Sequence, residues 1–266
     1  ETNNTIKNVG LFDLTPFSKF EIKSDKAHQE LQKICTANIK NEPGKCVYTH
    51  MLNSDGGIET DLTVVCVDKN HFRIISSAAT RERDKFHINK HLSKNVELKD
   101  ITDDLCVFGL FGPKSRDLLK TLSEDNFEND QFRFGFAKFI TIDGVKIWAQ
   151  RLSYVGELGY ELYVDLKNAK KIYELLIEKG KDFNLSNCGM HAMDIMRMES
   201  GFLHWGHDIS PEENQYQAGL AFTISNKKDV DFIGKQALEK IKQNKVKTRF
   251  SMFTLKESEP GKPLLL

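Results

Sequence analysis

Two acids and a hydroxyl share one face of a strand predicted near residue 60. The segment opens with the turn Ser54–Gly57, and its apolar residues alternate as Ile58, Leu62 and Val64. The opposite face then carries Glu59, Asp61 and Thr63. Such a face beside a glycine pair suits a polar ligand that the backbone approaches closely. A solvated hairpin face is the alternative, and exposed acids are the norm on surfaces.

A second acid lies in a strand predicted to begin at Gly159. Alternation puts Tyr160 and Leu162 on one face, and Glu161 and Tyr163 on the other. A carboxylate held at a strand start can accept two parallel hydrogen bonds from an amino-pyrimidine edge or from a guanidinium. An edge strand with an exposed acid is the alternative.

An arginine lies on a mostly apolar stripe of the helix predicted over Gly189–Glu199. Helical spacing aligns Arg197 with Met190 and Met193. An arginine in such surroundings needs a carboxylate partner, either from the protein as a structural ion pair or from an anionic ligand.

Other familiar chemistry is not supported by spacing. His204 and His207 have ligand-like spacing, but no other histidine or cysteine lies near them in the sequence, so we predict no metal site. The segment Gly109–Pro113 has the wrong glycine spacing for a nucleotide fold and a proline where a helix would cradle phosphate. No Ser-His-Asp arrangement can be argued from spacing.

Composition limits the class of protein. The 266 residues are 39% hydrophobic, enough for one large domain or two ordinary ones. Lysine plus arginine and aspartate plus glutamate number 38 each, so no net charge favours nucleic acid or a membrane surface. With neither a long apolar run nor a signal-peptide pattern, we expect a soluble protein in a reducing compartment, its five cysteines reduced.

Short strands joined by tight turns alternate with helices along the chain. Strands are predicted over residues 17–23, 46–52, 58–67, 72–76, 96–100 and 106–111, and then over 132–142, 145–152 and 159–165. Helices are predicted after Asp25 as a cap and over residues 80–92, 112–122, 166–179 and 189–199. This order favours an α+β fold with antiparallel sheets over a doubly wound parallel sheet.

Both ends of the sequence look cut. It opens with Glu1 rather than methionine, and it stops at the apolar run Leu264–Leu266 with no element after it to bury that run. We therefore expect a piece of a longer protein.

Motifs in one collinear order resemble a known family over nearly the whole chain. They are Val9–Glu21 with its Leu-Thr-Pro-Phe portion, Thr49–Asn53 with the hairpin after it, Ser153–Leu162, and His204–Gly206 through Asp231–Lys235. Together they resemble the folate-binding domain of dimethylglycine and sarcosine dehydrogenases, within the glycine cleavage T-protein, or aminomethyltransferase, family. The Leu-Thr-Pro-Phe portion favours the dehydrogenase branch.

The resemblance implies two intertwined α+β domains with folate between them. Residues 1–19 and 121–245 would form the first domain, and residues 20–120 the inserted second domain. Residues 246–266 would begin a truncated C-terminal β-barrel domain, whose contacts to the folate tail are then missing.

The resemblance also implies a set of site residues. The carboxylate matching Asp61 would be the catalytic group beside the reacting nitrogens of tetrahydrofolate, and the acid matching Glu161 would grip the pterin ring. The expected folate-binding residues are Tyr48, Asp61, Thr63, Tyr154, Glu161 and Arg197.

The implied activity is half of a two-step reaction. The domain would capture the methylene group from oxidative demethylation of dimethylglycine or sarcosine and form 5,10-methylenetetrahydrofolate. FAD would be bound only by a flavin oxidoreductase domain in the missing N-terminal part of the parent chain. Alternatives are a stand-alone T-protein-like aminomethyltransferase, a non-catalytic folate-binding module, and a structural domain in which the acids form ion pairs. The expected location is the cytoplasm or the mitochondrial matrix.

Overall fold

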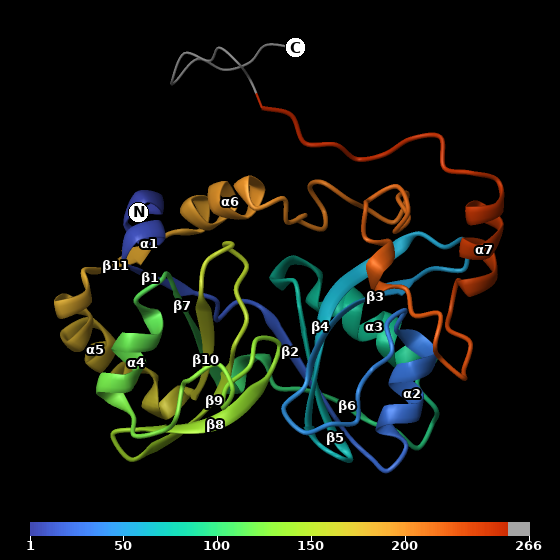
Figure 1. Cartoon of the computed structure of the whole chain (residues 1–266). Helices are drawn as coiled ribbons and strands as arrows, with labels where there is room; N and C mark the ends of the chain where they lie inside the picture. Colours follow the sequence, from blue (N-terminus) through green and yellow to red (C-terminus); the bar gives the residue numbers. More distant parts are fainter. Residues whose placement is uncertain (255–266) are drawn as a thin grey trace.

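Two β-sheets lie side by side in the computed structural model, which describes residues 1–254 (Figure 1). In this range, a six-stranded sheet has the order β11-β1-β7-β10-β9-β8 and a five-stranded sheet has the order β3-β4-β5-β2-β6. The strands of the first are β1 (Val9–Asp13), β7 (Leu105–Phe111), β8 (Ala137–Ile142), β9 (Val145–Gln150), β10 (Gly159–Asp165) and β11 (Leu185–Cys188). Those of the second are β2 (Ser18–Lys23), β3 (Cys46–Leu52), β4 (Ile58–Asp68), β5 (His71–Ser76) and β6 (Leu98–Asp100).

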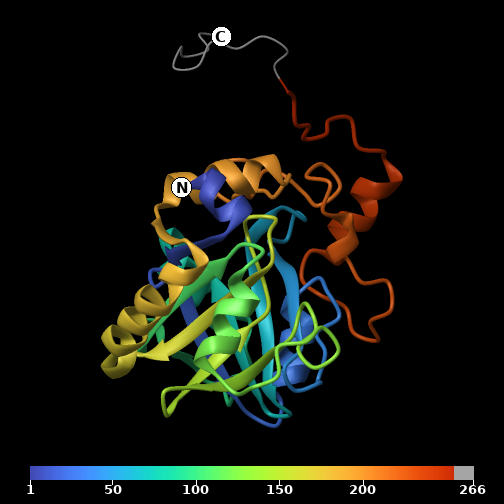
Figure 2. The ribbon, with the colours of Figure 1, turned by 60° about the vertical axis from the view of Figure 1, so that its left-hand side comes forward.

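Helices cover the outer faces of both sheets. Helices α4 and α5 pack on the six-stranded sheet, α2 and α3 lie beside the five-stranded sheet, and α6 lies across the top (Figures 1 and 2). The helices are α1 (Thr2–Lys7), α2 (Ala27–Ile34), α3 (Arg81–His91), α4 (Ser115–Leu122), α5 (Leu166–Gly180), α6 (Met190–Glu199) and α7 (Lys235–Gln243). None of the helices described is long and apolar enough to span a bilayer.

A shared core joins the inner faces of the two sheets. Val65 of the five-stranded sheet and Tyr163 of the six-stranded sheet belong to one buried cluster, which α6 completes with Met193. Separate clusters fill the space under α4 and α5 and under α2 and α3. Because sheet side chains alternate, residues two positions from Val65 or Tyr163 also point into the space between the sheets.

The predicted α+β class with antiparallel sheets is confirmed, with one exception and several shifted ends. Strand β11 pairs with β1 in parallel, whereas the other pairings are antiparallel. The strand predicted from residue 132 begins only at Ala137, because Gly135 has a φ of 73° and turns the chain. Asp25 does not cap α2, whose N-cap position is Lys26.

Elements α1, β1, β11 and α7 have no counterpart among the predicted ones. Strand β1 is buried on both faces over four residues and β11 is short and half polar, so neither shows period-two alternation. The domain boundaries stay a prediction. Strand β7 and most of α4 fall inside the predicted insertion, yet β7 belongs to the six-stranded sheet and α4 packs on it. In the range predicted to begin a barrel, residues 246–254 form no helix or strand, and residues 255–266 lie outside the described part.

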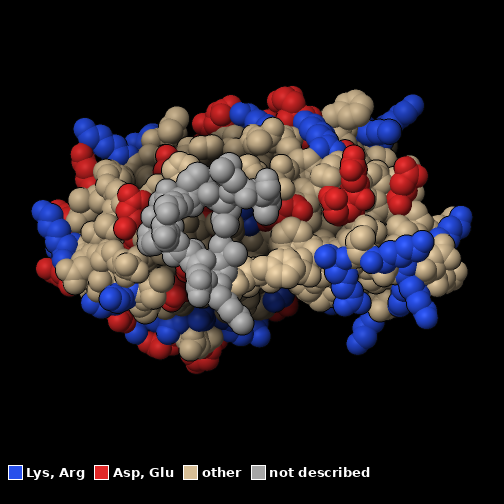
Figure 3. Space-filling model, turned by 90° about the horizontal axis from the view of Figure 1, so that it is seen from above, with Lys and Arg blue, Asp and Glu red and all other residues tan. Residues whose placement is uncertain are grey.

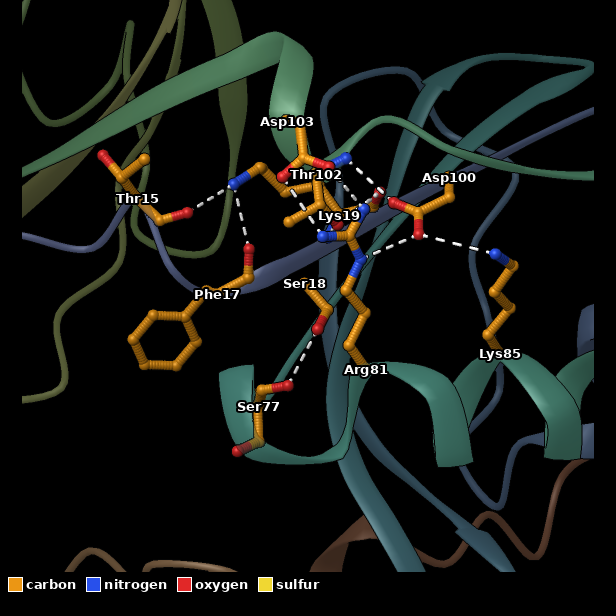
Figure 4. Close-up of polar contacts among 10 residues, drawn as sticks. All are labelled: Thr15, Phe17, Ser18, Lys19, Ser77, Arg81, Lys85, Asp100, Thr102 and Asp103. Carbon is orange, nitrogen blue, oxygen red and sulfur yellow. Dashed lines mark hydrogen bonds and ion pairs between the residues drawn. The ribbon is translucent and has the colours of Figure 1, made fainter.

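A buried lysine holds the chain where it crosses from the first sheet to the second. Lys19 is fully buried, and its Nζ donates to the carbonyls of Thr15 (2.8 Å) and Phe17 (2.9 Å) (Figure 4). Burial lowers the pKa of Lys19 to about 8. Beside it, Arg81 of α3 bonds Asp100 of β6 at 2.8 Å, which ties the helix to the edge of the five-stranded sheet. Figure 3 shows the molecule from above, where charged side chains of both signs are interspersed on the surface.

A buried ion pair lies on the inner face of the five-stranded sheet. Arg73 donates to Glu21, its cross-strand partner, at 2.8 Å, and His71 Nε2 lies 3.0 Å from the same carboxylate. Burial alone would raise the pKa of Glu21, but the bonds from His71 and Arg73 outweigh it and hold that pKa well below its usual range. The Arg73 guanidinium also lies 5.7 Å from the Tyr163 ring centroid of the other sheet.

We predict that Arg73→Met destabilises the fold by about 3 kcal/mol at pH 7, because the buried Glu21 then keeps only His71 and the exposed Lys23, 3.1 Å away, as partners. Urea unfolding followed by circular dichroism measures this. The matched control is Lys170→Met, which breaks an exposed pair with Glu174 and should change stability by less than about 0.5 kcal/mol. If the two substitutions change the free energy of unfolding equally, the buried Glu21–Arg73 pair does not stabilise the fold more than an exposed pair.

Candidate functional site

Strand β4 carries the first predicted acid on its inner face. Its burial alternates as the sequence predicts: Ile58, Leu62 and Val64 are buried, whereas Glu59, Asp61 and Thr63 are half-buried. The β3–β4 register sets Tyr48 opposite Thr63 and His50 opposite Asp61, so all four side chains share that face. Val65 continues the same face into the core between the sheets.

In the described part of the chain, the only side chain that hydrogen-bonds the Asp61 carboxylate is a neutral donor, Tyr48. The Tyr48 hydroxyl donates to Asp61 Oδ2 at 3.1 Å, and the Tyr48 side chain remains 39% exposed. Burial raises the pKa of Asp61 to about 6; the Tyr48 bond opposes this and the charge of Asp84 adds to it. An acid with a pKa near neutrality can both take and release a proton at physiological pH.

Tyr154 lies within electrostatic reach of this acid, in the loop between β9 and β10. Its hydroxyl donates to the Leu203 carbonyl at 2.7 Å, and its ring stacks on Phe202 with centroids 6.1 Å apart. Burial raises the pKa of Tyr154, Arg197 lowers it, and the Asp61 charge raises it further. The loop therefore brings an aromatic ring from the six-stranded sheet toward Asp61.

Glu161 lies on the inner face of β10. The Tyr163 hydroxyl donates to Glu161 Oε2 at 2.8 Å, and no cation among residues 1–254 pairs with this carboxylate. Burial raises the pKa of Glu161 to about 7, opposed by the Tyr163 bond. The Glu161 charge in turn adds to the burial that raises the pKa of Cys46 on β3, so Glu161 faces the other sheet.

An unsatisfied amide lies directly across from Glu161. Gln150 of β9 is its cross-strand partner and is fully buried. Both polar atoms of the Gln150 side chain lack a hydrogen-bond partner within the described residues. Buried polar groups are normally paired, so a carboxylate beside an unpaired amide fits a ligand with both donors and acceptors on one edge.

Arg197 forms the structural ion pair that its position on the apolar stripe allows. It is 4% exposed, and it bonds Asp194 at 2.7 Å, the Phe202 carbonyl at 3.1 Å and Asp208. Whether it also contacts folate stays a prediction. Glu59 is likewise held in an ion pair, by Arg83 at 2.6 Å, and is half-buried rather than part of a solvated face.

The glycine pair at the hairpin serves the protein's own packing rather than an approaching ligand. A Cβ on Gly57 would lie 1.8 Å from the Pro211 carbonyl, so the returning loop already occupies that space. The same loop is fixed by Trp205, whose Nε1 donates to the Ile58 carbonyl at 2.9 Å. His204 and His207 have ring centroids 4.3 Å apart, and the described residues hold no group of three metal-ligating side chains.

His50 is a site residue that sequence patterns did not single out. It is fully buried, and its Nε2 lies 3.3 Å from the Tyr48 hydroxyl. Alternation with Tyr48 along β3 was the only available signal, because the strand register that brings His50 opposite Asp61 is a tertiary fact.

We predict that Glu161→Gln stabilises the protein at pH 8. The pKa of Glu161 is about 7 in the folded state and 4.5 in the unfolded state. Between these two pH values the folded state binds more protons than the unfolded state, so the protein loses stability as the pH rises from 4.5 to about 7. Removing the charge should gain about 1–2 kcal/mol at pH 8, after allowance for partial exposure, and little at pH 4.5. Urea unfolding at both pH values tests this, and a gain independent of pH would contradict it.

Comparisons with known proteins give relatives along almost the whole chain. The family model described as the GCVT N-terminal domain matches residues 1–228. A 4-methylaminobutanoate oxidase (formaldehyde-forming) of Paenarthrobacter nicotinovorans is 37% identical over 95% of this chain and 31% of its own length. Mitochondrial dimethylglycine dehydrogenase of Rattus norvegicus is 34% identical over 96% and 30%. The chain thus spans about a third of the length of these relatives.

A shorter relative and a solved structure are also similar to this chain over most of its length. An aminomethyltransferase of Halothermothrix orenii is 32% identical over 96% of this chain and 71% of its own length. The crystal structure of glycine cleavage system aminomethyltransferase T from Bartonella henselae covers 91% of this chain and 65% of its own, with a TM-score of 0.81 and 21% identity, and so shows the same fold. With the family model matching most of the chain and relatives above 30% identity, this protein belongs to the GCVT, or aminomethyltransferase, family.

Proposed function

We propose that this chain binds a reduced folate between its two sheets and transfers a one-carbon unit onto it. The observation that carries the proposal is the pair of carboxylates, Asp61 and Glu161, on facing inner surfaces. Neither is paired with a cation in residues 1–254, and burial raises both pKa values. Two such acids cost stability, which functional sites commonly tolerate.

Glu161 and Gln150 fit the pterin end of a folate. The aminopyrimidinone edge of a pterin offers N–H donors beside a carbonyl acceptor. An ionised Glu161 accepts two parallel donors, and the Gln150 amide, whose two polar atoms are unpaired, supplies a donor and an acceptor. Glu161 thereby orients the ligand and takes no part in the chemistry.

Asp61 fits the reacting end. A folate would supply the amine nitrogens that take up the one-carbon unit, and these nitrogens must lose protons. Asp61 accepts a proton at its carboxylate oxygen and, while ionised, stabilises positive charge beside it, contributions worth about 10² to 10⁴ in rate. Thr63 shares the face of Asp61, Tyr48 donates to it, and the Asp61 charge acts on Tyr154, so we propose all three as folate contacts together with Arg197.

The names of the relatives suggest where the one-carbon unit comes from. The proteins at 37% and 34% identity are an oxidase that forms formaldehyde and a dimethylglycine dehydrogenase. We therefore propose capture of the methylene group from oxidative demethylation of an N-methyl amine, with FAD carried by a partner domain of the parent chain. A stand-alone aminomethyltransferase is the second candidate, since the Halothermothrix orenii relative matches over 71% of its length.

We predict that calorimetric titration with 5-formyltetrahydrofolate separates the roles of the two acids. Glu161→Ala should lose at least about tenfold in affinity, because a charge-assisted bidentate contact disappears. Asp61→Ala should bind within about threefold of the native chain, yet lose the catalysed formation of 5,10-methylenetetrahydrofolate, a loss of about 10² or more.

The matched control is Glu178→Ala, an exposed acid on α5 far from the inner faces. It should leave both binding and catalysis unchanged. If Glu161→Ala binds with native affinity, Glu161 does not hold the pterin. If Asp61→Ala turns over at the native rate, Asp61 is not the catalytic group.

A further inference from the structure

A chain of hydrogen-bonding groups runs from Asp61 on β4 across the edge strand β3 to a turn outside the five-stranded sheet. The Tyr48 hydroxyl lies 3.1 Å from Asp61 Oδ2 and 3.3 Å from His50 Nε2. On the other side of the imidazole, His50 Nδ1 lies 3.0 Å from Thr223 Oγ1, in the short helical turn Ala221–Thr223. His50 and Thr223 are both buried, at 0% and 4% exposure.

The hydroxyl of Thr223 fixes which nitrogen of His50 carries the proton. Thr223 Oγ1 donates its only hydrogen to the Leu220 carbonyl at 2.7 Å, so it can only accept from its other neighbours. The amide of Gln215 gives its two hydrogens to Thr223 (2.7 Å) and Thr36 (2.9 Å). The Gln215 nitrogen also lies 3.1 Å from His50 Nδ1, but its two hydrogens are taken by Thr223 and Thr36. We therefore assign the hydrogen of His50 to Nδ1, which donates to Thr223.

His50 is therefore an acceptor toward Tyr48. Burial lowers the pKa of His50 to about 3, so the ring is neutral at physiological pH and its Nε2 has a lone pair but no hydrogen. The Tyr48 hydroxyl has one hydrogen and two neighbours. When Asp61 is ionised, that hydrogen goes to the carboxylate and His50 Nε2 is left unpaired.

Protonation of Asp61 completes the chain of bonds. The new Asp61 hydroxyl donates to Tyr48 Oη, Tyr48 donates to His50 Nε2, and His50 Nδ1 donates to Thr223. Each donor then has one acceptor, so the buried network favours the protonated carboxyl. The other ionisable groups facing Asp61 are Asp84, whose charge acts in the same direction, and Tyr154.

We propose that His50 is a positioning residue that acts through Tyr48 to make Asp61 a stronger proton acceptor. The inference rests on the proposed function. In the step, an N–H bond of the folate breaks, an O–H bond of Asp61 forms, and the Tyr48 hydrogen turns from Asp61 to His50. No proton leaves His50, and the carboxylate loses its negative charge.

The experiment measures the pKa of Asp61 in this chain without folate, by ¹³C NMR titration of its carboxyl carbon. His50→Leu removes the acceptor and should lower that pKa by about one unit. Thr223→Val should lower it similarly, because His50 can then place its hydrogen on Nε2 and donate to Tyr48, while Gln215, 3.1 Å from Nδ1, donates to the other nitrogen. His50→Gln retains an acceptor and should keep the pKa nearer the native value.

The control is His28→Gln, a half-buried histidine on α2 bonded to the Ile39 carbonyl at 2.9 Å and outside the network. It should not move the pKa of Asp61. Long-range ¹H–¹⁵N spectra add an independent reading: native His50 should show Nδ1–H, and Thr223→Val should show Nε2–H. Thr223→Val retains the ring, so it remains informative if His50→Leu does not fold.

A native Nε2–H tautomer, or an unchanged pKa in both His50→Leu and Thr223→Val, would overturn the proposal. If the pKa moves as expected, the low-pH limb of the rate profile should move with it, by about one unit. If the pKa of Asp61 shifts but the chain does not turn over folate, the hydrogen-bond network is supported and the proposed function is rejected. Failure of this inference and failure of the proposed function therefore give different results.

Discussion

The constraint on which the structure depends is that two sheets share one core through their inner faces. That core is mostly apolar, from Val65 on one sheet to Tyr163 on the other, yet each face also places an acid in it. Burial without a cation raises the pKa of Asp61 to about 6 and of Glu161 to about 7. Arg73 bonds Glu21 on the same inner face as Asp61, so one buried acid has a cation partner, whereas Asp61 and Glu161 have none among the described residues.

The C-terminal part of the described chain supports the site from outside. After α6, the chain returns to the five-stranded sheet, where the Trp205 indole bonds the Ile58 carbonyl and Pro211 packs on Gly57. Further on, the Thr223 hydroxyl lies 3.0 Å from Nδ1 of His50 on β3. Residues 147 to 173 positions away in sequence thus hold β3 and β4, which makes the geometry of Asp61 a property of the whole fold.

The hydrogen-bond chain shows how a neutral buried histidine can matter without titrating. His50 remains uncharged throughout, because removing an imidazolium from water costs far more than its two hydrogen bonds return. Its influence lies in the direction of its bonds, which Thr223 sets. The hydrogen bonds of the network run in one direction, with every group paired, only when Asp61 is protonated. The network therefore favours the protonated carboxyl.

By itself the sequence determined the α+β class, the main antiparallel strands and the face on which each candidate acid lies, because alternation and turn residues are local signals. Collinear motifs added the family. Only the tertiary structure decided which acids stay unpaired: Glu59 meets Arg83, whereas Asp61 meets Tyr48, although both acids lie on the same face of one strand. It also supplied the parallel β1–β11 pairing, the unpaired Gln150 amide and the position of His50 opposite Asp61. Each depends on register and on contacts between distant segments, which no local pattern encodes.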